Sequence, residues 1–346
     1  MRSLRPRRSH LNYESYTVAL ICPLKVDLSA ARCMLDEEHE RLPGNTIDPN
    51  SYILGTLSGH NVVLATLPEG SQGPNAAAIV AAHLTRSFPA VELRLLVGCA
   101  GGVPSRNADI RLGDVVISAP TGTSGGVVQY DMVQETVAGS RRKGFLCPPP
   151  APWRSTIGKM RSDHRMRVNR IDEFVCKMMH KHPELKVYWR PPPERDVLFA
   201  AEYHHAVAGA PCTHCDRGKY VARARRAQPM KSEIFYGLIA SGNRVIRNGL
   251  KRDVLAQEAG GAICFDMEAA GLMNGFQCVV VRGIANYCDS HKSDEWNGYA
   301  AAAAVAVAKE MLTYIPPIVE PIIRLETLRL RGQRLGFSEE LHTYNC

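Results

Sequence analysis

Two neighbouring stretches combine a buried-type segment with polar side chains that could bind a ligand. The first, Cys264-Phe-Asp-Met-Glu-Ala-Ala-Gly271, places the carboxylate of Glu268 after a short apolar segment and at the start of a small-residue helix. The second has the composition of a buried strand over 278–282, and a polar cluster follows it: Asn286, Asp289, Ser290 and His291. Open α/β sheets bind ligands at the carboxyl ends of buried strands. A lone glutamate would more simply be an acid favoured by the helix dipole, but the two stretches together favour a ligand site.

Strand-like and helix-like patterns alternate along the rest of the chain. Apolar runs indicate buried strands over 16–22, 93–98, 112–118 and 235–240, with a hairpin at 51–67. Apolar residues at helical spacing, or runs of alanine, predict helices over 27–39, 75–88, 170–180 and 299–312. Such alternation is typical of an α/β fold with a largely parallel central sheet.

The chain divides into one main domain with an internal insertion and two tails. Residues 136–231 hold two proline triplets with arginine, histidine and lysine crowded between them, which indicates a loop-rich insertion. The domain around it spans 14–315. We expect a disordered basic tail over 1–13 and a peripheral tail over 316–346.

Composition and charge narrow the class of protein. The chain has 346 residues, of which 45% are hydrophobic, and no apolar run could span a bilayer. Its basic start lacks the apolar segment of a secretory signal. Eleven cysteines, several of them in apolar contexts, suggest reduced thiols in a cytoplasmic protein. The net charge is +8, and the basic residues are not interleaved with aromatic residues. This pattern favours solvated loops over a nucleic-acid-binding surface.

The sequence FDMEAAG followed by VVVRGIANYCDSHK resembles the nucleoside phosphorylase superfamily, which also contains the methylthioadenosine/S-adenosylhomocysteine nucleosidases. It looks closest to the phosphorylase-like domains of fungal proteins, which often sit beside NTPase or ankyrin modules. The resemblance covers about residues 16–135 and 232–312. It implies a three-layer fold, a purine nucleoside ligand, no metal or organic cofactor, and a homodimer or homotrimer.

The resemblance also implies roles for individual residues around a ribose and a purine. Glu268 matches a glutamate that accepts hydrogen bonds from the 2′- and 3′-hydroxyls. Met267 matches a methionine packed against the ribose, with Asp266 beside it, although a core methionine is an equally simple interpretation. The remaining substrate contacts implied are Ala100 and Gly101 in a glycine-rich turn after a strand, and Val245 and Ile246 stacked on the base. Apart from the resemblance, Tyr130 follows the Gly125-Gly126 turn and could form an apolar wall over the ribose, although an ordinary strand tyrosine is an equally simple interpretation.

Two positions bear on whether phosphate or water attacks the sugar. Phosphorylases hold the phosphate dianion with arginines, but the two matching positions here are Val26 and Leu96. Lys25 or Arg94 could substitute, although neither is in register. The sequence therefore predicts a pocket that lacks guanidinium groups beneath the sugar.

Asp27 falls where the nucleosidases carry a glutamate that activates water. A carboxylate there would repel phosphate and could accept a proton from water. Asp27 could also cap the helix that it begins, and the two roles are compatible. We therefore expect a hydrolase, with a phosphate-dependent phosphorylase or a catalytically silent nucleoside-sensing module as alternatives.

Asn286 stands where the family has an acid that protonates the purine N7. An amide cannot deliver that proton, but it can donate a hydrogen bond, and the trimeric 6-oxopurine phosphorylases use asparagine to hold inosine and guanosine. We expect a preference for these over adenosine. Asp289 is the nearest replacement acid, unless it is a buried structural carboxylate.

Cys212-Thr-His-Cys215 resembles half of a zinc site. A complete structural site needs four ligands, and the obvious additional ones are His204, His205 and His214. Because no second paired-cysteine motif follows, we expect a reduced loop without a metal.

Overall fold

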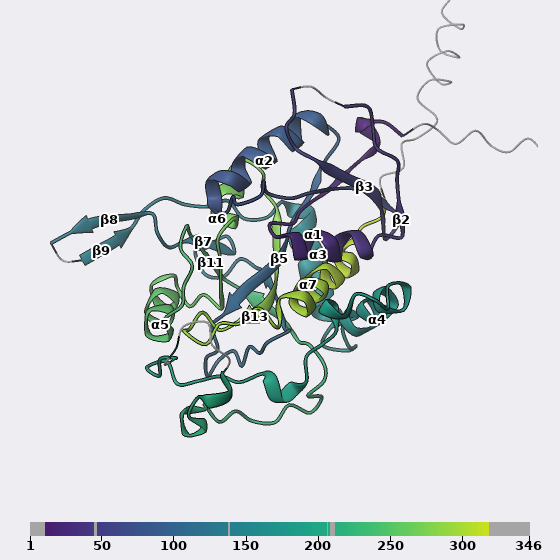
Figure 1. The fold of residues 1–346 in the computed structure, drawn as a ribbon. Helices are drawn as coiled ribbons and strands as arrows, with labels where there is room; N and C mark the ends of the chain where they lie inside the picture. Colours follow the sequence, from purple (N-terminus) through teal and green to yellow (C-terminus); the bar gives the residue numbers. More distant parts are fainter. Residues whose placement is uncertain (1–10, 45–46, 138, 206, 208–211, 318–346) are drawn as a thin grey trace, which may run out of the picture. The chain divides into compact units, whose positions relative to one another are not determined.

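A mixed, mostly parallel sheet forms the centre of the computed structural model (Figure 1). Among the described residues it holds eleven strands, eight of which follow the order β10-β6-β13-β5-β1-β4-β3-β2. These eight are β1 (Val18–Ile21), β2 (Glu37–Glu38), β3 (Tyr52–Leu57), β4 (His60–Ala65), β5 (Leu93–Gly102), β6 (Val115–Ser118), β10 (Ile234–Gly237) and β13 (Val279–Asn286). The other three are β7 (Val127–Gln129), β11 (Ile239–Ser241) and β12 (Cys264–Asp266). Because β5 runs parallel to both β1 and β13, the expected α/β class is confirmed.

Helices flank this sheet. They are α1 (Lys25–Cys33), α2 (Gly73–Ser87), α3 (Ala151–Asp163), α4 (Ile171–Lys181), α5 (Gly249–Glu258), α6 (Ala269–Leu272) and α7 (Asn297–Leu312). Figure 1 shows α1, α3 and α4 gathered around α7, whereas α2 and α6 pack together on the other side of β5. No described helix is long and apolar enough to cross a membrane.

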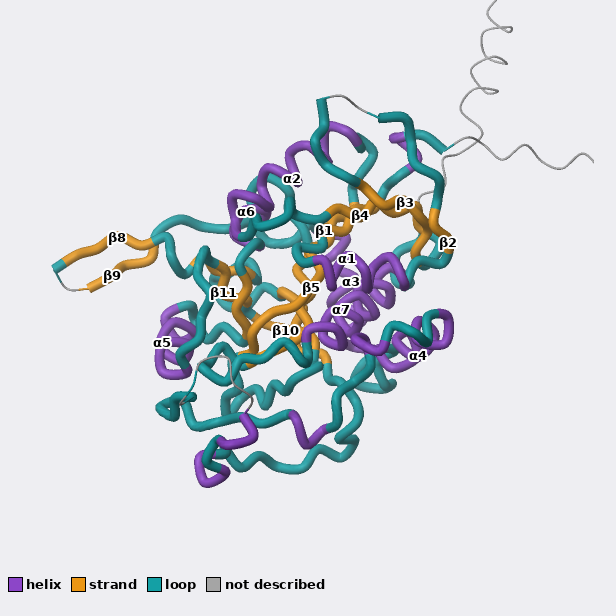
Figure 2. The backbone as a smooth tube through the Cα atoms, in the orientation of Figure 1, coloured by secondary structure: helices purple, strands orange, loops and turns teal. Residues whose placement is uncertain are grey.

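The structure describes residues 11–317, except 45–46, 138, 206 and 208–211. The described residues up to Pro316 belong to one compact unit. The tails expected over 1–13 and 316–346 lie almost wholly outside the described residues. Within the expected insertion, the stretch between α4 and β10 is drawn almost entirely as loop (Figure 2).

Strand β5 brings the two branches of the sheet together. Its first four residues pair with β1, and β13 pairs with it from Leu95 to Gly101. Its last two residues, Gly101 and Gly102, also pair antiparallel with β12. The sequence predicted that this strand ends at Gly98 in a glycine turn, which is wrong, because pairing with β12 extends the strand to Gly102. As a result, the ends of β5, β12 and β13 lie together.

Of two other expectations, one differs from the structure and the other is confirmed. The helix expected over 27–39 ends at Cys33, because Glu37 and Glu38 pair with β3 as an edge strand. The hairpin is confirmed: Ser58 and Gly59, with φ of 51° and 81°, connect β3 to β4. Positive φ at both residues suits the two-residue turns that follow the twist of a hairpin.

Helix α7 is buried along nearly its whole length, which its small residues make possible. Alanine and valine let the helix approach β13 so closely that a Cβ at Gly283 would overlap the carbonyl oxygen of Ala300. A helix that is apolar all round belongs in a core. This contact sets the distance between the helix layer and the strand that carries Arg282 and Asn286.

We predict that Gly283→Ala lowers the free energy of unfolding by about 1–3 kcal/mol, as expected when a methyl group is forced into a packed core. Gly158 in α3 provides the control, since a Cβ there meets nothing within 4 Å. Gly158→Ala should stabilise the protein by roughly 0.5–1 kcal/mol. Urea unfolding of both variants measures the difference, and equal stability of Gly283→Ala and wild type would contradict the packing described here.

Candidate active site

A cavity of about 370 Å³ opens where several strands end. Its walls come from the segments that follow β1, β11 and β12 and from the last residues of β5 and β13. This is the edge of an α/β sheet at which ligands bind. Nine of the predicted site residues line this one cavity: Asp27, Ala100, Gly101, Val245, Ile246, Asp266, Met267, Glu268 and Asn286.

The guanidinium group of Arg282 lies at the floor of the cavity, so the expectation of a pocket without guanidinium groups is wrong. Arg282 is 1% exposed. Its Nε donates to Asp266 Oδ2 at 3.1 Å, and its Nη2 donates to the same oxygen and to Glu268 Oε2 at 2.9 Å. A Cβ built on Gly98 would overlap the Asp27 carboxylate and lie 3.1 Å from Arg282 Nη1, so Gly98 leaves room for both groups.

The floor therefore holds one buried cation and three buried carboxylates. Burial raises the pKa of the Asp27 carboxyl above its ordinary value, although the charge of Arg282 opposes this effect. Burial likewise raises the pKa of the Glu268 carboxyl. The positive charge of Arg282 opposes this rise, and the negative charge of Asp266 adds to it. A buried carboxylate whose pKa is raised holds a proton more readily than an exposed one. Such a group is suited to accepting a proton near neutral pH.

Asp27 is completely buried and is held by two backbone amides. Leu24 N donates to its Oδ2 at 3.1 Å, and Cys99 N donates to its Oδ1 at 3.1 Å. The first contact caps the start of α1, and the second ties α1 to β5. Helix α1 begins at Lys25 with Leu24 at its N-cap, so the expectation that Asp27 begins and caps the helix is wrong. Asp27 instead caps the helix from its third position and also lies in the cavity wall.

Glu268 and Asp266 contribute differently to the site. Glu268 Oε1 accepts a hydrogen bond from Gly73 N at 3.3 Å, while its Oε2 accepts from Arg282. Asp266 Oδ2 accepts a hydrogen bond from Ala269 N at 3.1 Å and so caps α6. Because Asp266 supplies this cap, the Glu268 side chain does not, and it lines the cavity instead. Asp266 Oδ1 is buried and has no hydrogen-bond partner in the described part of the chain.

The other end of the cavity presents an amide, a thiol and an aromatic ring. Asn286 Oδ1 accepts from Cys288 N at 3.1 Å, which orients its Nδ2 as the group free to donate. Cys288 has a φ of 54°, and burial raises the pKa of its thiol to about 12, so the thiol is neutral. Phe265 and Ile246 add apolar surface to this end.

Four residues considered from the sequence lie elsewhere. Tyr130 does not line the cavity; its ring packs edge-on against Phe265 at 5.4 Å, and its hydroxyl donates to the Arg244 carbonyl. Asp289 also lies outside the cavity wall, where its Oδ1 accepts from His291 N. Neither proposed substitute cation reaches the cavity. Lys25 pairs with Glu69 on the surface, and Arg94 lies over the ring of Phe276.

Several lining residues were missed by sequence reasoning. Arg282 could have been found, because an arginine inside an otherwise apolar strand must be paired with acids. The others are Pro23, Leu24, Gln72, Cys99, Arg244, Phe265, Cys288, Lys292, Asp294 and Asn297. These residues come from separate segments, and no spacing in the sequence indicates that they meet.

Replacing Arg282 by methionine should destabilise the protein by about 3–5 kcal/mol at neutral pH, because it leaves buried carboxylates without their cation. Those carboxyls then have folded-state pKa values above their unfolded values. The penalty is therefore present at high pH and diminishes as pH falls through the folded-state pKa. The control is Arg32→Met, which removes an exposed pair with Glu38 and should cost less than about 1 kcal/mol. Urea titrations at several pH values test this, and a pH-independent penalty would be inconsistent with the cluster.

Comparison with known proteins identifies a family. The Phosphorylase superfamily profile matches residues 17–315. A nucleotide-binding leucine-rich repeat (NLR)-like protein of Hyaloscypha variabilis is 41% identical over 313 residues. That match covers 90% of this chain and 30% of the length of the relative.

Solved structures show the same fold at low sequence identity. The 5′-methylthioadenosine/S-adenosylhomocysteine nucleosidase of Neisseria meningitidis is similar with a TM-score of 0.53 and 17% identity, over 86% of this chain and 99% of that one. The futalosine hydrolase of Helicobacter pylori is similar with a TM-score of 0.52 and 13% identity, over 86% and 97%. These likenesses concern the fold, whereas the profile match spans most of the sequence. On that match, the chain belongs to the phosphorylase superfamily.

Proposed function

We propose that this protein hydrolyses the N-glycosidic bond of purine ribonucleosides, with water activated by Asp27. The observation that carries the proposal is the floor of the cavity, where Asp27, Asp266 and Glu268 outnumber the single guanidinium of Arg282. Cleavage of an N-glycosidic bond passes through a sugar with oxocarbenium character. Carboxylates around such a sugar stabilise its positive charge.

Each carboxylate has a distinct part in this proposal. Asp27 accepts the proton of the attacking water, and its raised pKa brings it closer to the operating pH. Glu268 accepts hydrogen bonds from the ribose hydroxyls, each worth roughly 1.5–3 kcal/mol for a charged acceptor. Asp266 holds Arg282 in place through two hydrogen bonds to one oxygen.

The same charges argue against phosphate as the attacking group. An arginine binds phosphate well when its donors are free, but Nε and Nη2 of Arg282 already donate to Asp266 and Glu268. A dianion would also meet the repulsion of the nearby carboxylates. Arg244 and Lys292 line the cavity as well, yet both are more exposed than Arg282. Hydrolysis is therefore favoured over phosphorolysis.

Asn286 supports guanosine or inosine as the substrate. Its Oδ1 is occupied by the Cys288 amide, so its Nδ2 faces the ligand as a donor. A donor there can bind the purine N7 without transferring a proton. A 6-oxopurine can carry its leaving charge on the ring and its oxygen, so it depends less on protonation at N7 than adenine does.

The NLR-like relative favours a second candidate function. The chain matches 30% of that larger protein, which is named as a nucleotide-binding leucine-rich repeat (NLR)-like protein. A phosphorylase-like module in such a protein could bind a nucleoside as a signal. In that case guanosine would bind but would not be cleaved.

Guanine release from guanosine in phosphate-free buffer tests the hydrolase proposal. We expect turnover that is unchanged by added phosphate, and a loss of roughly 10²–10⁴-fold in Asp27→Ala, the range that general-base catalysis supplies. Asn248→Ala is the control, because Asn248 caps α5 through Lys251 N and lies outside the cavity wall. It should lose about 1 kcal/mol of stability and keep its turnover. Strict phosphate dependence would refute hydrolysis, and tight guanosine binding without guanine release would favour the sensing module.

Asn286→Asp should shift preference towards adenosine, because a protonated carboxyl can donate the proton that departing adenine needs. The ratio of kcat/KM for adenosine to that for guanosine should rise, and the adenosine activity of the variant should decline as pH increases and the new carboxyl ionises. Asn297→Asp adds the same charge elsewhere in the cavity wall and should leave the ratio unchanged. An unaltered ratio in Asn286→Asp would mean that the purine ring does not bind next to residue 286.

A further inference from the structure

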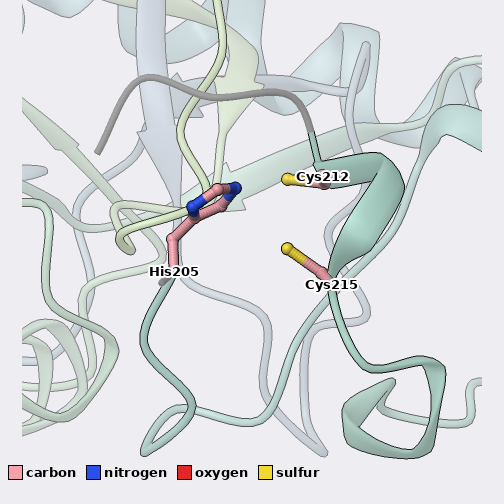
Figure 3. Close-up of side chains that lie close together, drawn as sticks. All are labelled: His205, Cys212 and Cys215. Atoms are coloured by element: carbon pink, nitrogen blue, oxygen red, sulfur yellow. The ribbon is translucent and has the colours of Figure 1, made fainter. Parts of the chain in front are cut away.

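A second cluster of reactive side chains lies outside the cavity, in the insertion. His205, Cys212 and Cys215 each offer a ligand atom, and these atoms all lie within 4.8 Å of one another. Figure 3 shows one ring nitrogen of His205 facing the two sulfurs. Neither His204 nor His214, the other candidates from the sequence, belongs to this group, and His291 lies outside it as well.

Local backbone contacts bring these three side chains together. Cys212 begins a 3-10 turn in which Cys215 N donates to Cys212 O at 3.1 Å, and this turn directs both sulfurs to the same side. His205 is held separately, because its backbone amide donates to Ser290 Oγ at 2.9 Å. The cluster therefore joins the insertion to the segment that follows β13.

Three imidazole nitrogens at this place are buried and have no hydrogen-bond partner among the described residues. They are Nε2 of His205 and both nitrogens of His291. The His291 side chain is 4% exposed, and its ring lies 5.2 Å from that of His205, centroid to centroid. Burying a polar group without a partner costs free energy. Imidazole nitrogens and thiol sulfurs that lie this close together are suited to donating lone pairs to one metal ion.

We propose that His205, Cys212, Cys215 and His291 bind one Zn²⁺ ion. Two sulfur and two nitrogen ligands form a set that zinc prefers in closed structural sites. Each thiol releases its proton to solvent on binding. Ligation through His205 Nε2 leaves the imidazole proton on Nδ1, so the 3.2 Å contact that Nδ1 now accepts from the Val207 amide is given up.

The surroundings of His291 fit a metal ligand. Its ring is stacked on Phe199 at 3.8 Å, which fixes the ring plane. Its Nδ1 lies 3.9 Å from Asp289 Oδ1, which is beyond hydrogen-bond distance. A small approach of that carboxylate would let it accept from Nδ1 and orient the ring once the other nitrogen is bound. This gives a role to Asp289, which lies outside the cavity wall.

The proposed ion would link the insertion to one wall of the cavity. His291 lies between Cys288 and Lys292, both of which line the cavity. Three of the four ligands belong to the part of the insertion between α4 and β10, where the described residues form loops and short 3-10 turns and no α-helix. A metal there would stabilise the insertion and hold the 288–292 segment in position.

Zinc content of the purified 346-residue chain tests the proposal. The protein is prepared under reducing conditions from cells supplied with zinc, and metal is measured by mass spectrometry. We expect one zinc per chain, lost in Cys212→Ser combined with Cys215→Ser. Two controls should keep their zinc: Cys176→Ser, an exposed cysteine in α4, and His214→Ala, which lies inside the motif but outside the cluster. Substoichiometric zinc in the wild type, or full zinc in the double variant, would overturn the proposal.

Two further measurements do not depend on the folding of the double variant. Cobalt(II) bound to the wild-type chain should show a thiolate charge-transfer band and the intense visible bands of a four-coordinate site, whereas weak six-coordinate bands would count against it. His291→Ala should release zinc to a competing chelator faster than wild type does, and an unchanged rate would remove His291 from the ligand set. A Cys212–Cys215 disulfide in protein prepared with reductant would also refute the site.

Discussion

The buried guanidinium of Arg282 is the charge on which the candidate active site depends. It sits on β13, next to the long central strand β5, and contacts carboxylates that arrive from β12 and from the start of α6. Without a cation, three carboxylates could not be buried together at acceptable cost. With one cation, they can be buried while the floor of the cavity keeps an excess of negative charge. Under the proposed function, that excess favours water and a cationic sugar over an inorganic anion.

Close packing of the backbone makes this charge arrangement possible. Gly98 leaves room for Asp27 and Arg282, Gly101 leaves room for Asn286 and Cys288, and Gly283 lets α7 approach β13. The left-handed conformation of Cys288 is a strained backbone geometry of the kind found at functional sites. It allows the chain to turn sharply after β13, so that the amide of Cys288 can bind Asn286.

The sequence predicted the fold class and nine of the twenty residues that line the cavity, because those features depend on local patterns. Buried strands show as apolar runs, and Glu268 and Asn286 lie within motifs that can be identified by resemblance. Other features depend on contacts between distant segments. The helix expected from residue 27 ends early because Glu37 and Glu38 pair with β3. Tyr130 packs against Phe265 and does not line the cavity. Similarly, the motif Cys212-Thr-His-Cys215 is only half a site until the fold brings His205 to it and places His291 beside His205.

A crystal structure grown with sulfate tests the central claim most directly, because sulfate mimics phosphate and the result does not depend on turnover. We predict an ordered water within hydrogen-bond distance of Asp27 and no sulfate at the floor of the cavity, with Arg282 still bound to Asp266 and Glu268. A sulfate bound to Arg282, with Asp27 turned out of the cavity, would contradict it.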